Sequence, residues 1–183
     1  MATTSSGTVY LADYIGNGGV ATVSGTGTTG TASGVGAVIL DGNSQVSSGR
    51  MRNGASNTLI VGEKSVSIAG AFGGNGSLGG DPGDISGIYY GYTGDTVAFA
   101  FPSGGPINDP RPGTTMTKYN VNIPVGQSSV TISNLGYGSA HPGGMNALFG
   151  DGSVKTITYG ISPTTFTAIS NRNNTLVVDM SDF

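Results

Sequence analysis

A glycine-rich turn between two apolar runs is the feature that most restricts how this chain can fold. The runs are Met145 to Phe149 and Val154 to Tyr159, and the residues between them read Gly-Asp-Gly-Ser. Asp-Gly in such a place favours a β-hairpin, because the turn needs a positive φ that glycine adopts without a steric penalty. The second run alternates between two faces, as a half-buried strand does. One face carries Val154, Thr156 and Thr158, and the other carries Lys155, Ile157 and Tyr159.

Composition favours one ordered, β-rich domain over residues 1–183. The chain has 34 glycines, only 9% charged residues and a net charge of -3, yet it keeps several apolar runs of strand length. Disorder usually needs high net charge and few apolar residues, so we interpret the glycines as long loops between strands. Seven Lys and Arg residues without a cluster argue against nucleic-acid binding, and the absence of Cys excludes disulfides and thiolate chemistry.

The pattern along the chain predicts an all-β or β-dominated (α+β) fold with a single antiparallel sheet, long Gly-rich loops and one short C-terminal helix. The helix is expected over Pro163 to Ser170, with Ser162 as its N-cap and Asn171 to Asn174 ending it. The tract from Gly16 to Gly36 is expected to be a loop or a weak β-ribbon, and Gly73 to Ser86 a long loop. Further strands are predicted at Thr8–Leu11, Val35–Leu40, Asn57–Val61, Val66–Phe72, Thr96–Phe101, Tyr119–Val125, Ser128–Leu135 and Thr175–Met180.

Three segments in order carry a resemblance to a known family. They are Asp13 to Gly19 (DYIGNGG), Ser56 to Glu63 (SNTLIVGE), and His141 followed after nine residues by Asp151-Gly152. Together they resemble the DUF1559 family of planctomycete-type pilin-like and pseudopilin proteins. The resemblance implies the globular head of a structural subunit, at the cell surface or outside the cell. It also implies a structural role for the motif residues Asn57, Glu63, His141, Asp151 and Gly152.

The start of the chain departs from this resemblance. Similar proteins usually begin with a prepilin peptidase site and a long apolar helix, whereas Met1 to Gly7 contains neither. Either this is an excised head, or the protein assembles in another way. In the second case we expect β-edge pairing or loop insertion, with residues 1–36 as an extended N-terminal arm and Thr8–Leu11 and Gly16–Gly36 as donors. The candidate interface residues are Val9, Tyr10, Leu11, Tyr90 and Tyr92.

His141, the single histidine, has two interpretations. It could act as a general base or metal ligand beside Asp151. Alternatively, its imidazole hydrogen-bonds Asp151 or a turn carbonyl and holds the hairpin. Ser139 lies two residues earlier, but no nucleophile elbow surrounds it. Glu63 could pair with Arg50 or Arg52 across the sheet, which would be a folding role.

The loops offer weaker candidates. Asp81, Asp84 and Asp95 could bind Ca²⁺ through their oxygens, although their spacing is not that of an EF-hand and such pairs usually mark turns. No other cofactor is expected. Tyr90 and Tyr92 share one face of a strand and could stack on a sugar or pack at a subunit interface.

These observations leave three functions in order. The first is a non-enzymatic structural subunit that forms a homo-oligomer or homopolymer. The alternative is a module that binds carbohydrate or a surface glycan through its tyrosines and acidic loops. The third is a hydrolase-type enzyme using His141 and Asp151.

Overall fold

The computed structural model describes residues 2–4, 7–9, 12–23, 29–32, 35–38, 46–64, 96–100, 107–108, 118–122, 130–133, 136–139 and 141–178. The predicted strand Val66–Phe72 and the predicted loop Gly73–Ser86 lie outside these ranges. Within them the fold is β-dominated, with one α-helix near the C-terminal end. This confirms the expected fold class.

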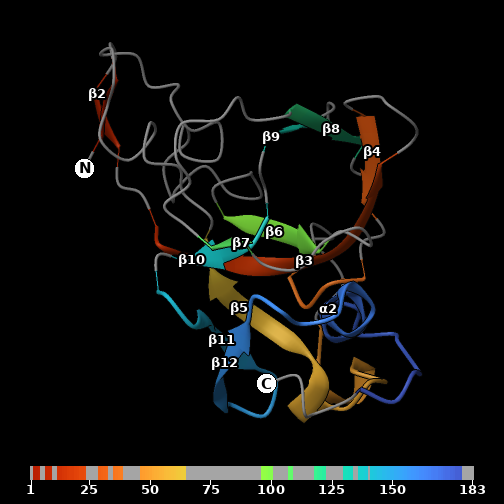
Figure 1. Cartoon of the computed structure of the whole chain (residues 1–183). Helices are drawn as coiled ribbons and strands as arrows, with labels where there is room; N and C mark the ends of the chain where they lie inside the picture. Colours follow the sequence, from red (N-terminus) through yellow and green to blue (C-terminus); the bar gives the residue numbers. More distant parts are fainter. Residues whose placement is uncertain are drawn as a thin grey trace.

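Eight of the described strands form one sheet whose central member is β3 (Tyr14–Val23). One end of the sheet follows the order β12 (Val154–Thr158), β11 (Gly144–Phe149), β5 (Leu59–Glu63) and β3. From the far half of β3 it continues through β4 (Thr29–Ala32), β8 (Lys118–Asn122) and β9 (Val130–Ser133). The long β3 curves through the middle of the fold and joins these two parts (Figure 1).

The sheet is mixed rather than antiparallel throughout. The pairs β12–β11, β11–β5 and β5–β3 are antiparallel, as expected. However, β6 (Val97–Ala100) runs parallel to β3 on its other side, and β4 pairs with β8 in parallel. Two small pairs are not part of this sheet's ladder: β1 (Ala2–Thr4) with β2 (Gly7–Val9), and β7 (Ile107–Asn108) with β10 (Gly138–Ser139).

The predicted hairpin is confirmed as β11 and β12. Leu148 pairs with Val154, and Phe149 N–H donates to the Ser153 carbonyl at 2.9 Å, which closes the turn. Gly152 has φ +85°, the left-handed backbone that the Asp-Gly signal requires. The alternation also holds, because Ile157 is buried whereas Val154, Thr156 and Thr158 are exposed.

The predicted helix is confirmed as α2 (Pro163–Ser170). Its N-cap Ser162 accepts a hydrogen bond from Thr165 N–H at 3.0 Å, and Pro163 occupies the first helical position, where no N–H is needed. Asn171 is the C-cap. Two short 3₁₀ helices, η1 (Ser48–Arg50) and η2 (Ala55–Asn57), precede β5.

The Gly16–Gly36 tract contains the central strand of the sheet, so its prediction as a loop was wrong and the β-ribbon alternative was closer. Glycine is needed because neighbours approach the β3 backbone closely. A Cβ at Gly18 would lie 2.5 Å from a Val97 methyl, and Gly19 has φ +111°. The predicted strand Val35–Leu40 is instead a bend over 36–38 that hydrogen-bonds to β3, with residues 39 and 40 outside the described ranges.

Two other predicted strands also need correction. The strand expected at Asn57–Val61 begins at Leu59, because Asn57 ends η2. Residues 175–178 of the expected closing strand Thr175–Met180 are not in a strand. There the Asn174 side chain accepts from Leu176 N–H at 3.3 Å, a local bond that competes with strand pairing.

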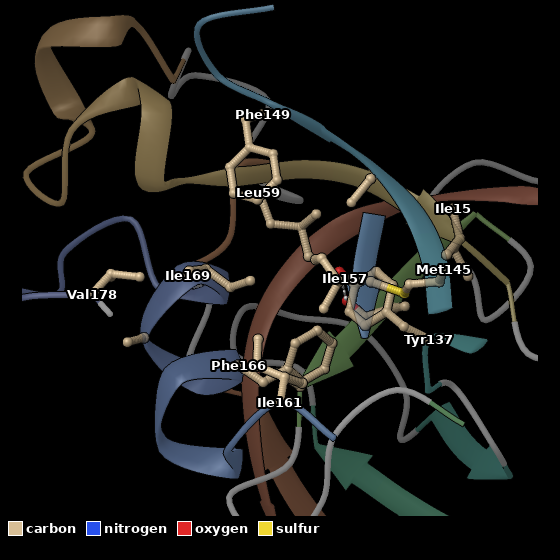
Figure 2. Packing of buried hydrophobic residues seen from close by; sticks show 14 residues of the cluster. Ile15, Leu59, Tyr137, Met145, Phe149, Ile157, Ile161, Phe166, Ile169 and Val178 are labelled. Atoms are coloured by element: carbon tan, nitrogen blue, oxygen red, sulfur yellow. Dashed lines mark hydrogen bonds between the residues drawn. The ribbon is translucent and has the colours of Figure 1, made fainter. Parts of the chain in front are cut away.

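The hydrophobic core lies between the sheet and α2, which contacts β3, β5 and β6 (Figure 2). Tyr137 packs edge-on against Phe166 of the helix, with ring centroids 5.6 Å apart. The largest fully buried apolar side chains come from both layers: Ile15, Leu59, Phe99, Tyr137, Met145, Phe149, Ile157, Phe166 and Ile169.

Candidate functional site

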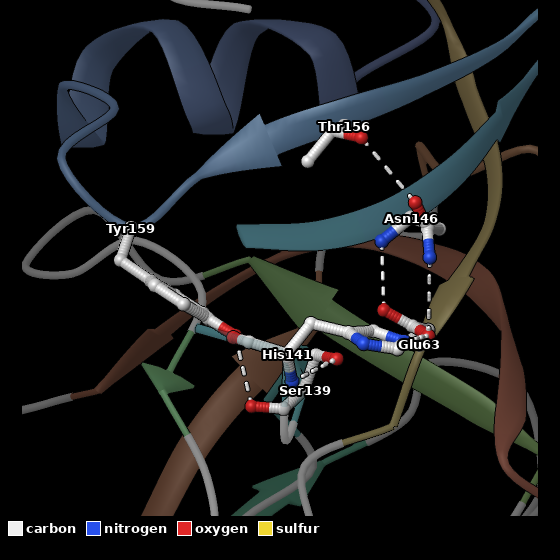
Figure 3. Close-up of polar contacts among 6 residues, drawn as sticks. All are labelled: Glu63, Ser139, His141, Asn146, Thr156 and Tyr159. Carbon is white, nitrogen blue, oxygen red and sulfur yellow. Dashed lines mark hydrogen bonds and ion pairs between the residues drawn. The ribbon is translucent and has the colours of Figure 1, made fainter. Parts of the chain in front are cut away.

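A polar cluster lies where the hairpin begins, on the open face of the sheet. We call it the His141 cluster (Figure 3), and it consists of Glu63, Ser139, His141, Asn146, Thr156 and Tyr159. The sheet register explains why these side chains lie close together. Glu63 ends β5 beside Asn146 of β11, and Asn146 is paired with Thr156 of β12. A row of side chains on one face therefore crosses three strands.

Glu63 lies at the β5 end of this row. Its carboxylate accepts from the Asn146 backbone N–H at 2.7 Å and lies 3.4 Å from the Asn146 side-chain nitrogen. The backbone ladder of β5 and β11 ends at Gly62–Ala147, so the carboxylate takes the amide that would next have paired with the β5 backbone. Glu63 thus fastens the two strands together where their backbone ladder stops.

His141 also contacts the Glu63 carboxylate. The imidazole Nε2 lies 3.1 Å from a Glu63 oxygen, and since a carboxylate only accepts, Nε2 is the donor. The backbone of the loop before β11 is held by the Ser139 and Tyr159 side chains. Ser139 Oγ accepts from His141 N–H at 3.1 Å, and the Tyr159 hydroxyl reaches the carbonyls of Ser139 and His141 at 2.8 and 2.7 Å. The His141 side chain itself stays 62% exposed.

The predicted contact between His141 and Asp151 was wrong. The two residues lie at opposite ends of the hairpin, because Gly144 pairs with Thr158 and the intervening strand spans roughly 17 Å. Asp151 Oδ1 instead accepts from Ser153 N–H at 2.9 Å and from its hydroxyl at 2.6 Å. These bonds, with the side-chain one the largest cause, lower the pKa of Asp151. Asp151 therefore shapes the turn.

The predicted pairing of Glu63 with Arg50 or Arg52 was also wrong, since the described partners of Glu63 are His141 and Asn146. Arg50 instead lies near Arg172, and burial together with the charge of Arg50 lowers the pKa of Arg172. Arg172 donates to the carbonyls of Val35 and Gly36, which fixes the bend over β3.

Asn57 joins η2 to the preceding turn. Its side chain donates to the Asn53 carbonyl at 3.2 Å, while the Asn53 side chain donates to the carbonyls of Asn57 at 2.7 Å and Ala168 at 3.1 Å. The Asn53 side chain therefore links the Asn57 carbonyl, just before β5, to helix α2.

Asn17 is the site residue that sequence reasoning missed. It is fully buried in β3, and its side chain donates to the carbonyls of Leu59 at 2.7 Å and Ser170 at 3.0 Å. Its oxygen accepts from Gly19 N–H at 2.9 Å and from the Tyr137 hydroxyl at 3.1 Å. One amide thereby connects β3, β5, α2 and the segment before β10. The signal for this role was an asparagine among glycines in Asp13–Gly19, a segment that we interpreted only through its family resemblance.

Other predicted residues cannot be placed. Asp81, Asp84, Asp95, Tyr10, Leu11, Tyr90 and Tyr92 lie outside the described ranges, and Val9 is described only as part of β2. In the described part of the chain, no three His, Asp or Glu side chains come together as a metal site would require. No helix in the same ranges is long and apolar enough to cross a membrane.

The contacts of the His141 cluster join β5, β11 and the loop before β11 within one chain, and we call this set of contacts the latch. Ser139 Oγ accepts a backbone N–H rather than facing the imidazole, and Glu63 uses both oxygens on its own chain. The fold and site thus describe a β-dominated domain whose three sequence motifs bond to one another or to the core.

The chain belongs to the DUF1559 family, described as proteins of unknown function, whose family model matches residues 1–164. Searches of curated proteins and of solved structures gave no match.

Proposed function

We propose that this protein is a non-enzymatic structural subunit of a filament or surface assembly located outside the cell. One observation carries the proposal: the described motif residues make internal contacts. Asn17 joins β3 to the helix, Asn57 donates to the turn at Asn53, Glu63 fastens β5 to β11, and Asp151 shapes a turn. A motif set used in this way supports a scaffold, which suits a building block.

Charge supports the same proposal. A net charge of -3 on 183 residues leaves little repulsion between copies at high local concentration. The exposed face of the hairpin is also uncharged at Val154, Thr156 and Thr158. Contacts between copies then require no desolvation of charged groups at that face, which is the costly step in polar association.

Electron microscopy of the purified protein over rising concentration tests the proposal. Ordered polymers or regular arrays are the expected result. Particles that stay monodisperse at every concentration, in both low and high salt, would contradict it. The variant Glu63→Gln is a control for the contribution of the Glu63 contacts, because it alters these contacts without changing the surface shape.

A carbohydrate-binding module is the second candidate, favoured by Tyr14. Its side chain is 53% exposed and lies opposite Glu63 on the same open face as His141. An exposed phenol ring beside hydrogen-bonding groups suits stacking on a sugar. A glycan-binding screen with Tyr14→Ala as the matched variant checks this. Binding that is lost in Tyr14→Ala while its melting temperature is unchanged would favour the module over the subunit.

A further inference from the structure

We propose that the outer edge of β12 is a contact between two copies of this chain, joined as antiparallel strands with Thr156 of one copy opposite Thr156 of the other. The inference rests on the proposed function as an assembling subunit and names the surface that would carry it. It differs from one donor segment expected from the sequence, the Gly16–Gly36 tract, because β3 of that tract already holds the centre of its own sheet.

The backbone of β12 points hydrogen-bonding groups outward. Phe149 donates to Ser153, and hydrogen-bonded pairs in an antiparallel ladder recur at every second residue. The paired residues of β12 are therefore Lys155 and Ile157, which face β11. It follows that the N–H and C=O groups of Val154 and Thr156 point away from β11. In the part of the chain that the structure describes, no hydrogen bond reaches these groups, and β12 pairs with β11 only.

The edge also lacks the usual protection. Soluble proteins commonly guard an exposed edge with a lysine that points along it or with a proline. The one charged residue of β12, Lys155, is drawn back over its own subunit instead. Its Nζ lies 4.6 Å from the centre of the Phe149 ring and 3.2 Å from the Ser56 carbonyl. The edge that remains carries uncharged, β-branched side chains, which pair well across strands.

The strand is complementary to itself. With Thr156 opposite Thr156, Val154 lies opposite Thr158 and Lys155 lies opposite Ile157 of the other copy. The neighbouring register, centred on Lys155, would set two lysines directly opposite each other, and like charges in that position are destabilising. The Thr158 carbonyl already accepts from Ile161 N–H at 3.2 Å, so the outward backbone groups of Thr156 at the two-fold axis carry this isologous pairing.

The open face of the sheet beside the β12 edge also favours a second copy of the chain as the partner of that edge. Val154 is 68% exposed and pairs with Leu148, which is also exposed, so a small apolar patch adjoins the edge. Two-fold pairing places two such patches on one continuous sheet. The contact of one short strand is smaller than a standard stable interface, so it joins copies reversibly and gains strength when repeated in an array.

Sedimentation velocity of the full chain across a hundredfold concentration range tests the pairing. The expected result is a reversible dimer or larger species. Thr156→Lys brings two positive charges together at the two-fold axis and should weaken association on the order of tenfold, with recovery in high salt. Thr156→Val, which keeps the backbone and the branched shape, is the matched control and should associate like the parent.

Thr156→Pro gives an independent variant. The Thr156 N–H points outward, so proline removes the donor at the edge and no backbone bond to β11. It also removes the exposed bond from Thr156 Oγ1 to Asn146 Oδ1, which Thr156→Val removes as well. Its melting curve by circular dichroism shows whether it has folded, and if it has not, Thr156→Lys alone decides. Association that is unchanged in Thr156→Lys would overturn the inference, as would a parent chain that stays monomeric throughout.

The outcome for this edge is separable from that for the proposed function. Polymers that form equally well in Thr156→Lys would leave the subunit function standing and refute this contact. A dimer that is sensitive to Thr156→Lys, without polymers in the microscope, would support the contact and count against the filament.

Discussion

Replacing Asn17 by alanine removes one side chain on which four buried groups depend. The Leu59 and Ser170 carbonyls lose their donor, and Gly19 N–H and the Tyr137 hydroxyl lose their acceptor. Each buried polar group left without a partner costs about 1–3 kcal/mol, and the Tyr137 hydroxyl keeps a weaker contact at 3.4 Å with the Ala98 carbonyl. We therefore expect Asn17→Ala to lower the free energy of unfolding by about 3–6 kcal/mol, a large part of the stability of an ordinary domain.

Urea denaturation followed by far-ultraviolet circular dichroism measures this loss, since the chain has no Trp for fluorescence. Two variants grade the result. Tyr137→Phe removes a single hydroxyl and should cost about 1 kcal/mol. Asn173→Ala makes the same chemical change at an exposed position and should stay within about 0.5 kcal/mol of the parent. A loss below about 1 kcal/mol for Asn17→Ala would refute the view that this amide joins the two layers.

Three further predictions follow from single positions. Gly19→Ala should lower the free energy of unfolding by more than about 2 kcal/mol in a urea melt, because Gly19 has φ +111° and a new Cβ would lie 2.6 Å from a backbone nitrogen. Gly143→Ala is the control and should be nearly neutral, because a Cβ there meets nothing within 4 Å. Asp151 has a pKa below its ordinary value of 3.8, so its contribution to stability is present above that value and disappears as the pH falls through the lower folded pKa. Asp151→Asn should therefore flatten the dependence of the melting temperature on pH in that acidic range. An unchanged profile would contradict the turn bonds. His141→Ala should cost about 1 kcal/mol or less by the same melts, since the imidazole is largely exposed and Glu63 keeps its bonds to β11; a loss of several kcal/mol would show that the latch depends on His141.

The hairpin and the helix were predictable because their signals act over a few residues. Asp151-Gly152 supplies the turn backbone directly, and Ser162 followed by Pro163 starts a helix through one side chain and one ring. The alternation in β12 also placed Ile157 in the core correctly. Each of these depends on chemistry between neighbours in the chain, so no knowledge of distant segments was needed.

The site was less predictable because its contacts join distant segments. His141 was expected beside Asp151, which is close in sequence, but a hairpin separates the ends of that motif by the length of its arm. Glu63 was expected beside an arginine, yet the residue that reaches it depends on β11 lying next to β5. Spacing in the sequence could not reveal that adjacency.

Taken alone, the sequence determined the class of fold, the membership of the DUF1559 family, and the elements whose turns and caps are written in adjacent residues. Tertiary structure alone decided that a glycine-rich tract forms the central strand, and that Asn17 bonds to groups 42, 120 and 153 residues away. The physical reason is one of range. A turn or cap is settled by the backbone preferences of two to four residues, whereas a buried amide acquires its partners only after the sheet and the helix have packed around it.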